Sequence, residues 1–119
     1  MKVNNTFVQV TTDNPEALLK FYHEVVGLPK AENMGDHALD AGGTTIGFDS
    51  HSEVSGSVKE PARTMLDFFV DDIKAEQKRI EGQGVKFIRT EGHEYWGGVI
   101  STFADPDGNL VQLIEFRPE

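Results

Sequence analysis

The residues best suited to chemistry lie in two short segments of the second half of the chain. In one of them, Trp96 is the only tryptophan, Tyr95 precedes it, and neighbouring glycines permit close backbone approach. An aromatic face of this kind can stack on a planar ligand or hold a cation. The same residue type also suits a core or a dimer interface, so the segment alone leaves both roles open.

The other segment contains Asp67 between two large apolar residues. Residues 64–70 have the composition of a strand. Because side chains alternate along a strand, Met65, Asp67 and Phe69 share one face, and the residues between them form the better core face. A carboxylate in an aromatic-lined cleft could pair with a basic ligand group or act as a general base. The alternative is a structural aspartate satisfied by hydrogen bonds.

Histidines are the remaining candidates for chemistry. His23 falls on or near the polar side of the first predicted helix, where a solvated role is expected. His51 lies in a loop with Glu53 nearby, and the pair could hold a metal or simply face water. His37 begins a strand-like piece and His93 lies in the segment of Trp96.

Two similar series of elements position these residues. The first has strands over 7–12, 37–41 and 44–48 and a helix that follows Asn14, and the second has strands over 64–70, 85–88, 99–103 and 110–116 and a helix that follows Asp72. The capping residues Asn14 and Asp72 are 58 positions apart, and the helix-ending Gly27 and Gly84 are 57 apart. This spacing predicts one domain of two duplicated modules, about 1–50 and 63–119, joined by a linker over 51–62. Neither half is large enough to bury both faces of its sheet, so we expect paired sheets that line a shared trough.

The series resembles the vicinal oxygen chelate superfamily, which includes glyoxalase I, extradiol dioxygenases, fosfomycin-resistance enzymes and bleomycin-resistance proteins. The resemblance covers nearly the whole chain. The matching segments are Phe21-Tyr22, Val26-Gly27-Leu28, Phe69-Val70-Asp71-Asp72, Gly84-Val85, Trp96-Gly97-Gly98, Phe103 and Asp105-Pro106-Asp107-Gly108-Asn109. It implies an α+β fold of two βαβββ modules that form a cupped, eight-stranded mixed sheet with helices on its outer face, in a homodimer.

Metal-dependent relatives carry ligands at four positions, which the resemblance places at Phe7, Gly47 (or Thr45 in a shifted register), Met65 and Gln112. Phenylalanine and glycine offer no ligand atom, and the methionine thioether is poorly suited to hard divalent ions. Gln112 alone is a plausible oxygen donor. We therefore expect the metal site of the family to be absent and no cofactor to be needed.

Composition excludes several other functions. The 119 residues include no cysteine, which rules out disulfides, thiolate catalysis and zinc–thiolate sites. Twenty acidic residues against 11 basic ones give a formal charge of −9, which disfavours nucleic acid and anionic membranes as partners. No apolar run approaches the roughly 20 residues of a membrane span, and the first residues do not resemble a signal peptide, so we expect a cytoplasmic protein.

The leading hypothesis is a metal-independent protein that binds or sequesters a small, partly aromatic molecule, which could carry a positive charge. Its expected ligand-binding residues are Phe7, Gln9, Met65, Asp67, Phe69, Trp96 and Gln112. One alternative is a metal-dependent lyase or isomerase of the glyoxalase type, or a dioxygenase, that uses an unusual ligand set such as His37, His51 or His93. A second alternative is an accessory or regulatory module whose sheets serve only dimerisation. The residues do not name the ligand.

Overall fold

The chain divides into two compact units, and each is described by itself. The computed structural model describes residues 1–118. The first unit covers 1–57 and the second begins at Val58, so the boundary lies inside the segment that the sequence indicates as a linker. Each unit combines helix with a small sheet, which confirms the α+β class. Among the described residues, no helix is both long and apolar enough to cross a membrane.

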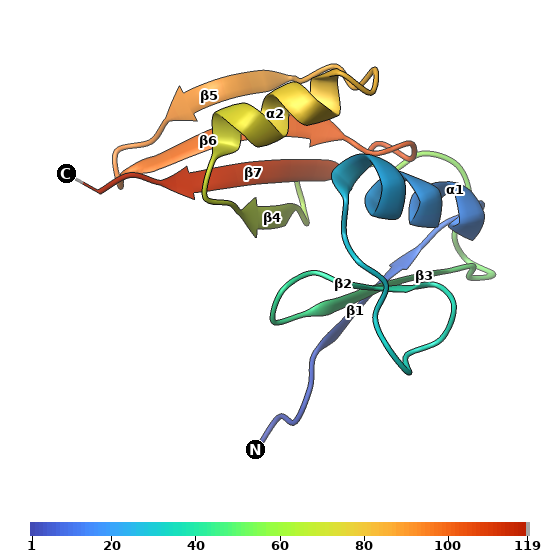
Figure 1. Ribbon diagram of the computed structural model, residues 1–119. Coiled ribbons are helices and arrows are strands. Elements are labelled where there is room, and N and C mark those ends of the chain that lie inside the picture. The colour runs from blue at the N-terminus through green and yellow to red at the C-terminus, as the bar shows by residue number, and fades with distance from the viewer. Residues whose placement is uncertain (119) are drawn as a thin grey trace. The chain divides into compact units, whose positions relative to one another are not determined.

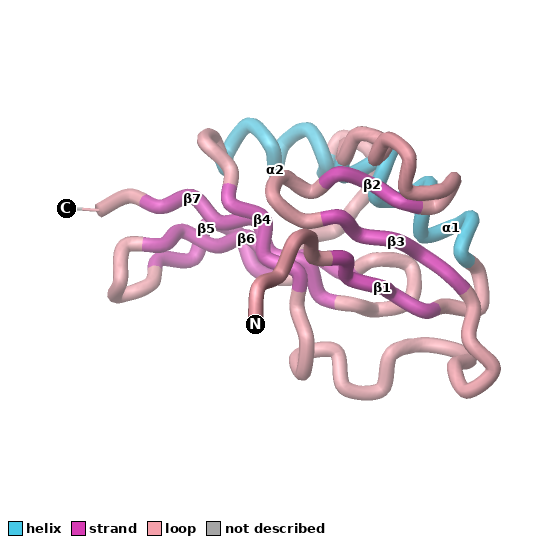
Figure 2. The backbone as a smooth tube through the Cα atoms, turned by 90° about the horizontal axis from the view of Figure 1, so that it is seen from below, coloured by secondary structure: helices cyan, strands magenta, loops and turns pink. Residues whose placement is uncertain are grey.

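The first unit has a three-stranded sheet and one helical segment. Its elements are β1 (Phe7–Thr11), α1 (Pro15–Lys20), η1 (Phe21–Val26), β2 (Ala38–Asp40) and β3 (Thr45–Asp49). The strand order is β1-β3-β2, with β1 parallel to β3 and β2 antiparallel to it. Figure 2 shows the three strands side by side in this order.

Local chemistry fixes both ends of the helical segment. The Asn14 side chain accepts a hydrogen bond of 3.1 Å from the backbone N–H of Ala17, and Pro15 takes the first helical position. Gly27 ends the segment in the left-handed conformation, with φ of 97°. The predicted extent is correct, but its second half, η1, is a π-helix. The segment turns Tyr22 into the core, where its ring stacks on Phe48 at 5.1 Å between centroids.

The first unit has one strand fewer than the family resemblance implies. The described residues contain seven strands, not eight, in separate sheets of three and four. Where a further strand was expected, a single bridge joins Lys30 to Leu39. Asn33 and Gly35, with φ of 60° and 89°, fold the intervening segment into turns, and an extended strand cannot continue through such residues.

The second unit has a four-stranded sheet with a helix on one face. Its elements are β4 (Leu66–Phe69), α2 (Ile73–Glu81), β5 (Arg89–His93), β6 (Gly98–Ala104) and β7 (Leu110–Phe116), and the strand order is β4-β7-β6-β5. β4 is parallel to β7, and the other pairs are antiparallel. Helix α2 lies over the sheet (Figure 1), with Ile73, Gln77 and Ile80 buried. Ser101 of β6 donates a 2.5 Å hydrogen bond to Gln77, so this serine points towards the helix.

The prediction of a strand over 85–88 is wrong by about four residues. Pairing begins where the Ile88 N–H donates to the Thr102 carbonyl at 2.7 Å, and β5 follows from Arg89. Gly84 has a left-handed φ of 92°, which turns the chain after the end of α2. The next residues carry the chain to the edge of the sheet. Phe87 anchors this crossing, because it is buried and lies 5.1 Å from the Phe103 ring. The apolar residues at 85–88 therefore belong to a connection between α2 and β5 that Phe87 holds in the core.

Candidate functional site

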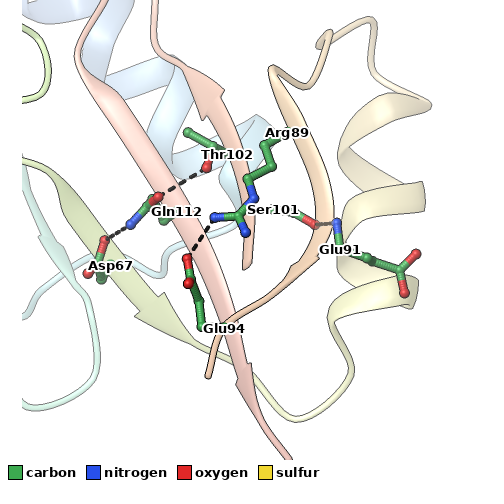
Figure 3. A network of polar contacts seen from close by, with 7 residues as sticks. All are labelled: Asp67, Arg89, Glu91, Glu94, Ser101, Thr102 and Gln112. Atoms are coloured by element: carbon green, nitrogen blue, oxygen red, sulfur yellow. Dashed lines mark hydrogen bonds and ion pairs between the residues drawn. The ribbon is translucent and has the colours of Figure 1, made fainter. Parts of the chain in front are cut away.

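A row of polar side chains crosses the sheet of the second unit. Arg89 on β5 pairs with Thr102 on β6, which pairs with Gln112 on β7, which pairs with Asp67 on β4. Ser101, the neighbour of Thr102, points towards α2, so strand alternation places the row on the opposite face. Figure 3 shows the row with its polar contacts. We call these four residues the polar row.

Three members of the polar row form a continuous hydrogen-bonded chain. The Thr102 hydroxyl donates to Gln112 Oε1 at 3.1 Å, and Gln112 Nε2 donates to Asp67 Oδ1 at 2.9 Å. This hydrogen-bonded chain ends on the exposed carboxylate of Asp67, on the edge strand β4. The sequence-predicted residues Asp67 and Gln112 are therefore in direct contact.

At the other end of the polar row, the charge of Arg89 is already compensated. Arg89 Nη1 lies 2.9 Å from Glu94 Oε1, and the two side chains point towards each other (Figure 3). The guanidinium passes over Gly92, where an added Cβ would lie only 1.9 Å from Arg89 Nε. Asp67, by contrast, takes part in no ion pair within residues 1–118. Asp67 thus provides the uncompensated charge of the row.

Exposed aromatic rings border the polar row on one side. Phe69 lies two residues beyond Asp67 on β4, and Phe116 lies opposite Gly98 in the β6–β7 pair. The Trp96 ring covers Gly98 and stacks on Phe116, with centroids 6.3 Å apart and planes at 18°. The exposed fractions are 66% for Phe69, 55% for Phe116 and 41% for Trp96. We call these three rings the aromatic border, while Met65, also exposed, lies on the other side of Asp67.

The turn between β5 and β6 adds a cavity of about 480 Å³ beside Trp96. The Glu94 N–H donates to the Gly98 carbonyl at 2.8 Å and closes this turn. The volume falls within the range of small-molecule sites. The lining residues are His93, Glu94, Tyr95, Trp96, Gly97, Arg117 and Pro118.

The first unit carries a different cavity, of about 290 Å³. Two predicted residues, Phe7 and Gln9, line it from β1, and Gly47 lines it from β3. The Phe7 ring covers Gly47 so closely that an added Cβ would lie 2.2 Å from Phe7 Cζ. The remaining lining residues are Met34, Gly35, Asp36, His37, Ala38, Phe48 and Asp49.

Sequence reasoning missed three contributors to the second-unit surface. Arg89 lies just beyond the predicted strand over 85–88, and Phe116 is only the last residue of the predicted strand over 110–116. Thr102 lies in a segment that is apolar except for Ser101 and itself, and its position opposite Gln112 emerges only from the β6–β7 register. The signal available in the sequence was strand alternation, which separates Thr102 from Ser101.

The family's metal-ligand positions do not fit a divalent ion in this chain. At Phe7 and Gly47 a ring fills the space where ligand atoms would be needed. The Gln112 oxygen already accepts from Thr102, and Met65 offers only a thioether. Within residues 1–118, no group of three or more His, Asp or Glu side chains is arranged to hold a metal.

The histidines of the alternative metal set have other partners or lie apart. His37 Nε2 lies 2.7 Å from Glu16 Oε1 and ties β2 to α1. His51 Nδ1 accepts from the Glu53 backbone N–H at 3.0 Å, and His93 lines the cavity of the second unit. His23, outside this set, contacts the Leu28 carbonyl through Nδ1 at 2.8 Å.

Glu115 joins the C-terminal segment to helix α2. Its carboxylate accepts from the Arg117 side chain and, at 2.9 Å, from the Ile73 backbone N–H at the start of the helix. The hydrogen bond from Arg117 and then that from Ile73 lower the pKa of Glu115 below its ordinary value. Because Arg117 also lines the cavity beside Trp96, this carboxylate holds one wall of that cavity.

Comparisons with known proteins agree with this architecture. Residues 5–113 match the family model of the Glyoxalase/Bleomycin resistance protein/Dioxygenase superfamily. The uncharacterized protein YraH of Bacillus subtilis (strain 168) is 26% identical over 108 residues, covering 80% of this chain and 84% of YraH. The crystal structure of TnmS3, an antibiotic binding protein from Streptomyces sp. CB03234, has a TM-score of 0.74 and 25% identity, covering 98% of each chain.

A second solved structure shows the same fold. It is a glyoxalase/bleomycin resistance protein/dioxygenase family enzyme from Burkholderia phytofirmans PsJN, with a TM-score of 0.75 and 23% identity. The similarity covers 93% of this chain and 97% of that one. The family match spans nearly all of the present sequence, including both units and the duplicated elements. The chain therefore belongs to the Glyoxalase/Bleomycin resistance protein/Dioxygenase superfamily.

Proposed function

We propose that this protein binds a small, partly aromatic molecule on the face of the second sheet opposite α2, without a metal ion. The observation that carries the proposal is the aromatic border on the same sheet face as an uncompensated carboxylate. Trp96, Phe116 and Phe69 expose their rings on this face, and Phe69 lies two residues from Asp67 on β4. The similarity to TnmS3, an antibiotic binding protein, supports a binding function.

The two parts of this surface have complementary chemistry. Aromatic pairs contribute about 0.5–1.5 kcal/mol beyond the area that they bury, so a planar ligand gains from stacking on Trp96 or Phe116. The Asp67 carboxylate attracts a positively charged group, and the formal charge of −9 favours the approach of cations. The proposed ligand therefore combines a planar ring with a basic group.

The other predicted properties belong to the same proposal. Met65 is proposed as a further contact on the second sheet, and Phe7 and Gln9 are proposed as ligand contacts within the separate cavity of the first unit. We propose that the protein works in the cytoplasm and, as the family resemblance implies, as a homodimer. Light scattering on the purified protein gives its oligomeric state directly.

Calorimetric titration with planar aromatic compounds tests the binding site. We expect the cation 9-aminoacridine to bind more tightly than the neutral acridone, and phenanthrene-9-carboxylate to bind weakest. Trp96→Leu should weaken 9-aminoacridine binding about tenfold, while Trp96→Phe, which keeps a ring, should retain most of the affinity. Absence of binding by all three compounds, or an unchanged affinity in Trp96→Leu, would contradict the proposal.

Elemental analysis separates binding from the metal-dependent alternative. The protein is purified without chelator and its content of nickel, zinc, manganese and iron is measured. We expect less than one tightly bound metal ion per ten chains. One ion per chain that is lost when His37, His51 and His93 are replaced would favour a lyase, isomerase or dioxygenase instead.

A further inference from the structure

We propose that Thr102 and Gln112 are positioning residues that orient the Asp67 carboxylate for a protonated amine on the ligand. This inference rests on the binding function proposed above and adds the rule by which the site selects its ligand. Its basis is the direction of the hydrogen-bonded chain that joins the three side chains.

The direction of this chain follows from chemistry at both contacts. An ionised carboxylate can only accept hydrogen bonds, so the Gln112 atom facing Asp67 must be the donating amide nitrogen. The amide oxygen then faces Thr102, whose hydroxyl must donate to it. The opposite amide orientation would place an oxygen against a carboxylate oxygen and is unfavourable. Asp67 therefore selects the amide orientation, and Thr102 stabilises it.

Because Thr102 is buried, its hydroxyl has a specific role as the partner of the Gln112 oxygen. The exposed fraction of Thr102 is only 7%, so loss of its hydroxyl leaves the Gln112 oxygen without its protein partner at a part-buried contact. The Gln112 amide would then be held by Asp67 alone, and its nitrogen would hold Asp67 Oδ1 less firmly. With the chain intact, Asp67 Oδ1 is engaged by Gln112 while the exposed carboxylate keeps acceptor capacity for a ligand.

The opposite end of the polar row disfavours an anionic ligand. Arg89 is the cation of this row, and its guanidinium is paired with Glu94 at 2.9 Å. A ligand carboxylate or phosphate would have to compete with Glu94 for the positive charge of Arg89. An amine, by contrast, meets a carboxylate that has no ion-pair partner within residues 1–118.

Strand geometry adds a spacing requirement. Asp67 and Phe69 are two residues apart on β4, and side chains so placed lie about 6–7 Å apart on one face. The amine and the ring of the ligand should be separated by a similar distance. The structure thus points to arylalkylamines, in which a short flexible chain joins a ring to a protonated nitrogen.

Tryptamine and its uncharged counterpart tryptophol provide a matched test by calorimetric titration. We expect the unaltered protein to bind tryptamine at least about tenfold more tightly than tryptophol, and indole-3-propionate more weakly than either. Asp67→Asn should abolish the preference for the amine. Thr102→Val should reduce the preference at least threefold with little change in tryptophol affinity, whereas Thr102→Ser, which keeps the hydroxyl, should retain it.

The outcomes distinguish failure of this inference from failure of the binding function. If tryptophol binds but tryptamine is not preferred, or if Thr102→Val keeps the full preference, the positioning role is wrong and the binding site stands. If no indole compound binds, both proposals fall. Should Thr102→Val fail to fold, Gln112→Met, which keeps the side-chain length without the amide, takes its place with the same expectation.

Discussion

The two units contain the same three-stranded arrangement, yet they present different surfaces. In each, a first strand lies parallel to the last strand of the unit, which pairs antiparallel with the strand before it. Gln9 and Asp67 occupy matched positions, each five residues before the residue that caps the helix. The strand registers then match the row Gln9–Gly47–Ala38 in the first unit with Asp67–Gln112–Thr102 in the second.

The side chains at these matched positions decide what each face can do. In the second unit they form a hydrogen-bonded chain that ends in a carboxylate. In the first unit Gly47 and Ala38 have no polar side-chain atoms, and the Phe7 ring covers the glycine. The strand pairing that the two units share therefore does not decide what either face can bind. Three side chains make the face of the second unit polar, whereas a ring covers the matched face of the first unit.

The largest expected effect tests whether each sheet has the same division into a core face and an open face. Phe48→Ala in the first unit and Phe103→Ala in the second remove rings that are almost completely buried, and each should lower the free energy of unfolding by about 3–5 kcal/mol. Phe7→Ala and Phe69→Ala remove exposed rings and should cost about 1 kcal/mol or less. Urea unfolding measures all four. Equal losses for Phe48→Ala and Phe7→Ala would refute the assignment of faces in the first unit. Equal losses for Phe103→Ala and Phe69→Ala would refute it in the second.

A smaller effect is expected where a ring covers a glycine. An added Cβ at Gly98 would lie 2.0 Å from Trp96 Cη2, so Gly98→Ala should push the ring off the sheet at a cost of up to about 1–3 kcal/mol. Since Trp96 is the only tryptophan, its emission should shift to longer wavelength as the ring becomes more hydrated. Gly43→Ala, at a position with no atom within 4 Å of the added Cβ, serves as the control. An unshifted emission in Gly98→Ala would show that the ring does not rest there.

The smallest effect concerns pH and the carboxylate that ties α2 to the C-terminal segment. The pKa of Glu115 is lowered by Arg117 and Ile73, so folding favours the ionised form. Its stabilising contribution is present above the unfolded pKa, about 4.3, and is lost as the pH falls through the lower folded value. The stability difference between the unaltered protein and Glu115→Gln should therefore shrink as the pH is lowered from 6 to 3. Urea unfolding across this range measures it, with exposed Glu32→Gln as control, and a difference that stays constant would contradict the pKa direction.

Most elements that carry strong local signals were predictable. The caps at Asn14 and Asp72 and the strands around Phe48, Phe103 and Leu113 lie where the sequence indicates. The alternation of β4 also placed Asp67 and Phe69 together on the exposed side. These features depend on neighbours a few residues away, which is why a single sequence reveals them.

The predictions that failed concern strands whose position depends on distant pairing partners. Residues 85–88 have the composition of a strand, but β5 begins at Arg89 because pairing with β6 sets its register. The expected eighth strand is reduced to one bridge, since turns at Asn33 and Gly35 interrupt it. Neither outcome can be read from β propensity, which responds to the surrounding sheet as much as to the residue itself.

By itself, the sequence determined the duplication, the α+β class, the acidic charge and the absence of ligand atoms at two of the four positions that bind metal in relatives. The charge and the duplicated pattern follow from residue types and their spacing along the chain, whereas the fold class and the four positions follow from the resemblance to the family. The tertiary structure decided that Thr102, Gln112 and Asp67 form one directed chain and that Glu94 compensates Arg89. Hydrogen bonds and ion pairs require atoms within about 3 Å, and only the strand registers bring residues up to 45 positions apart to that distance.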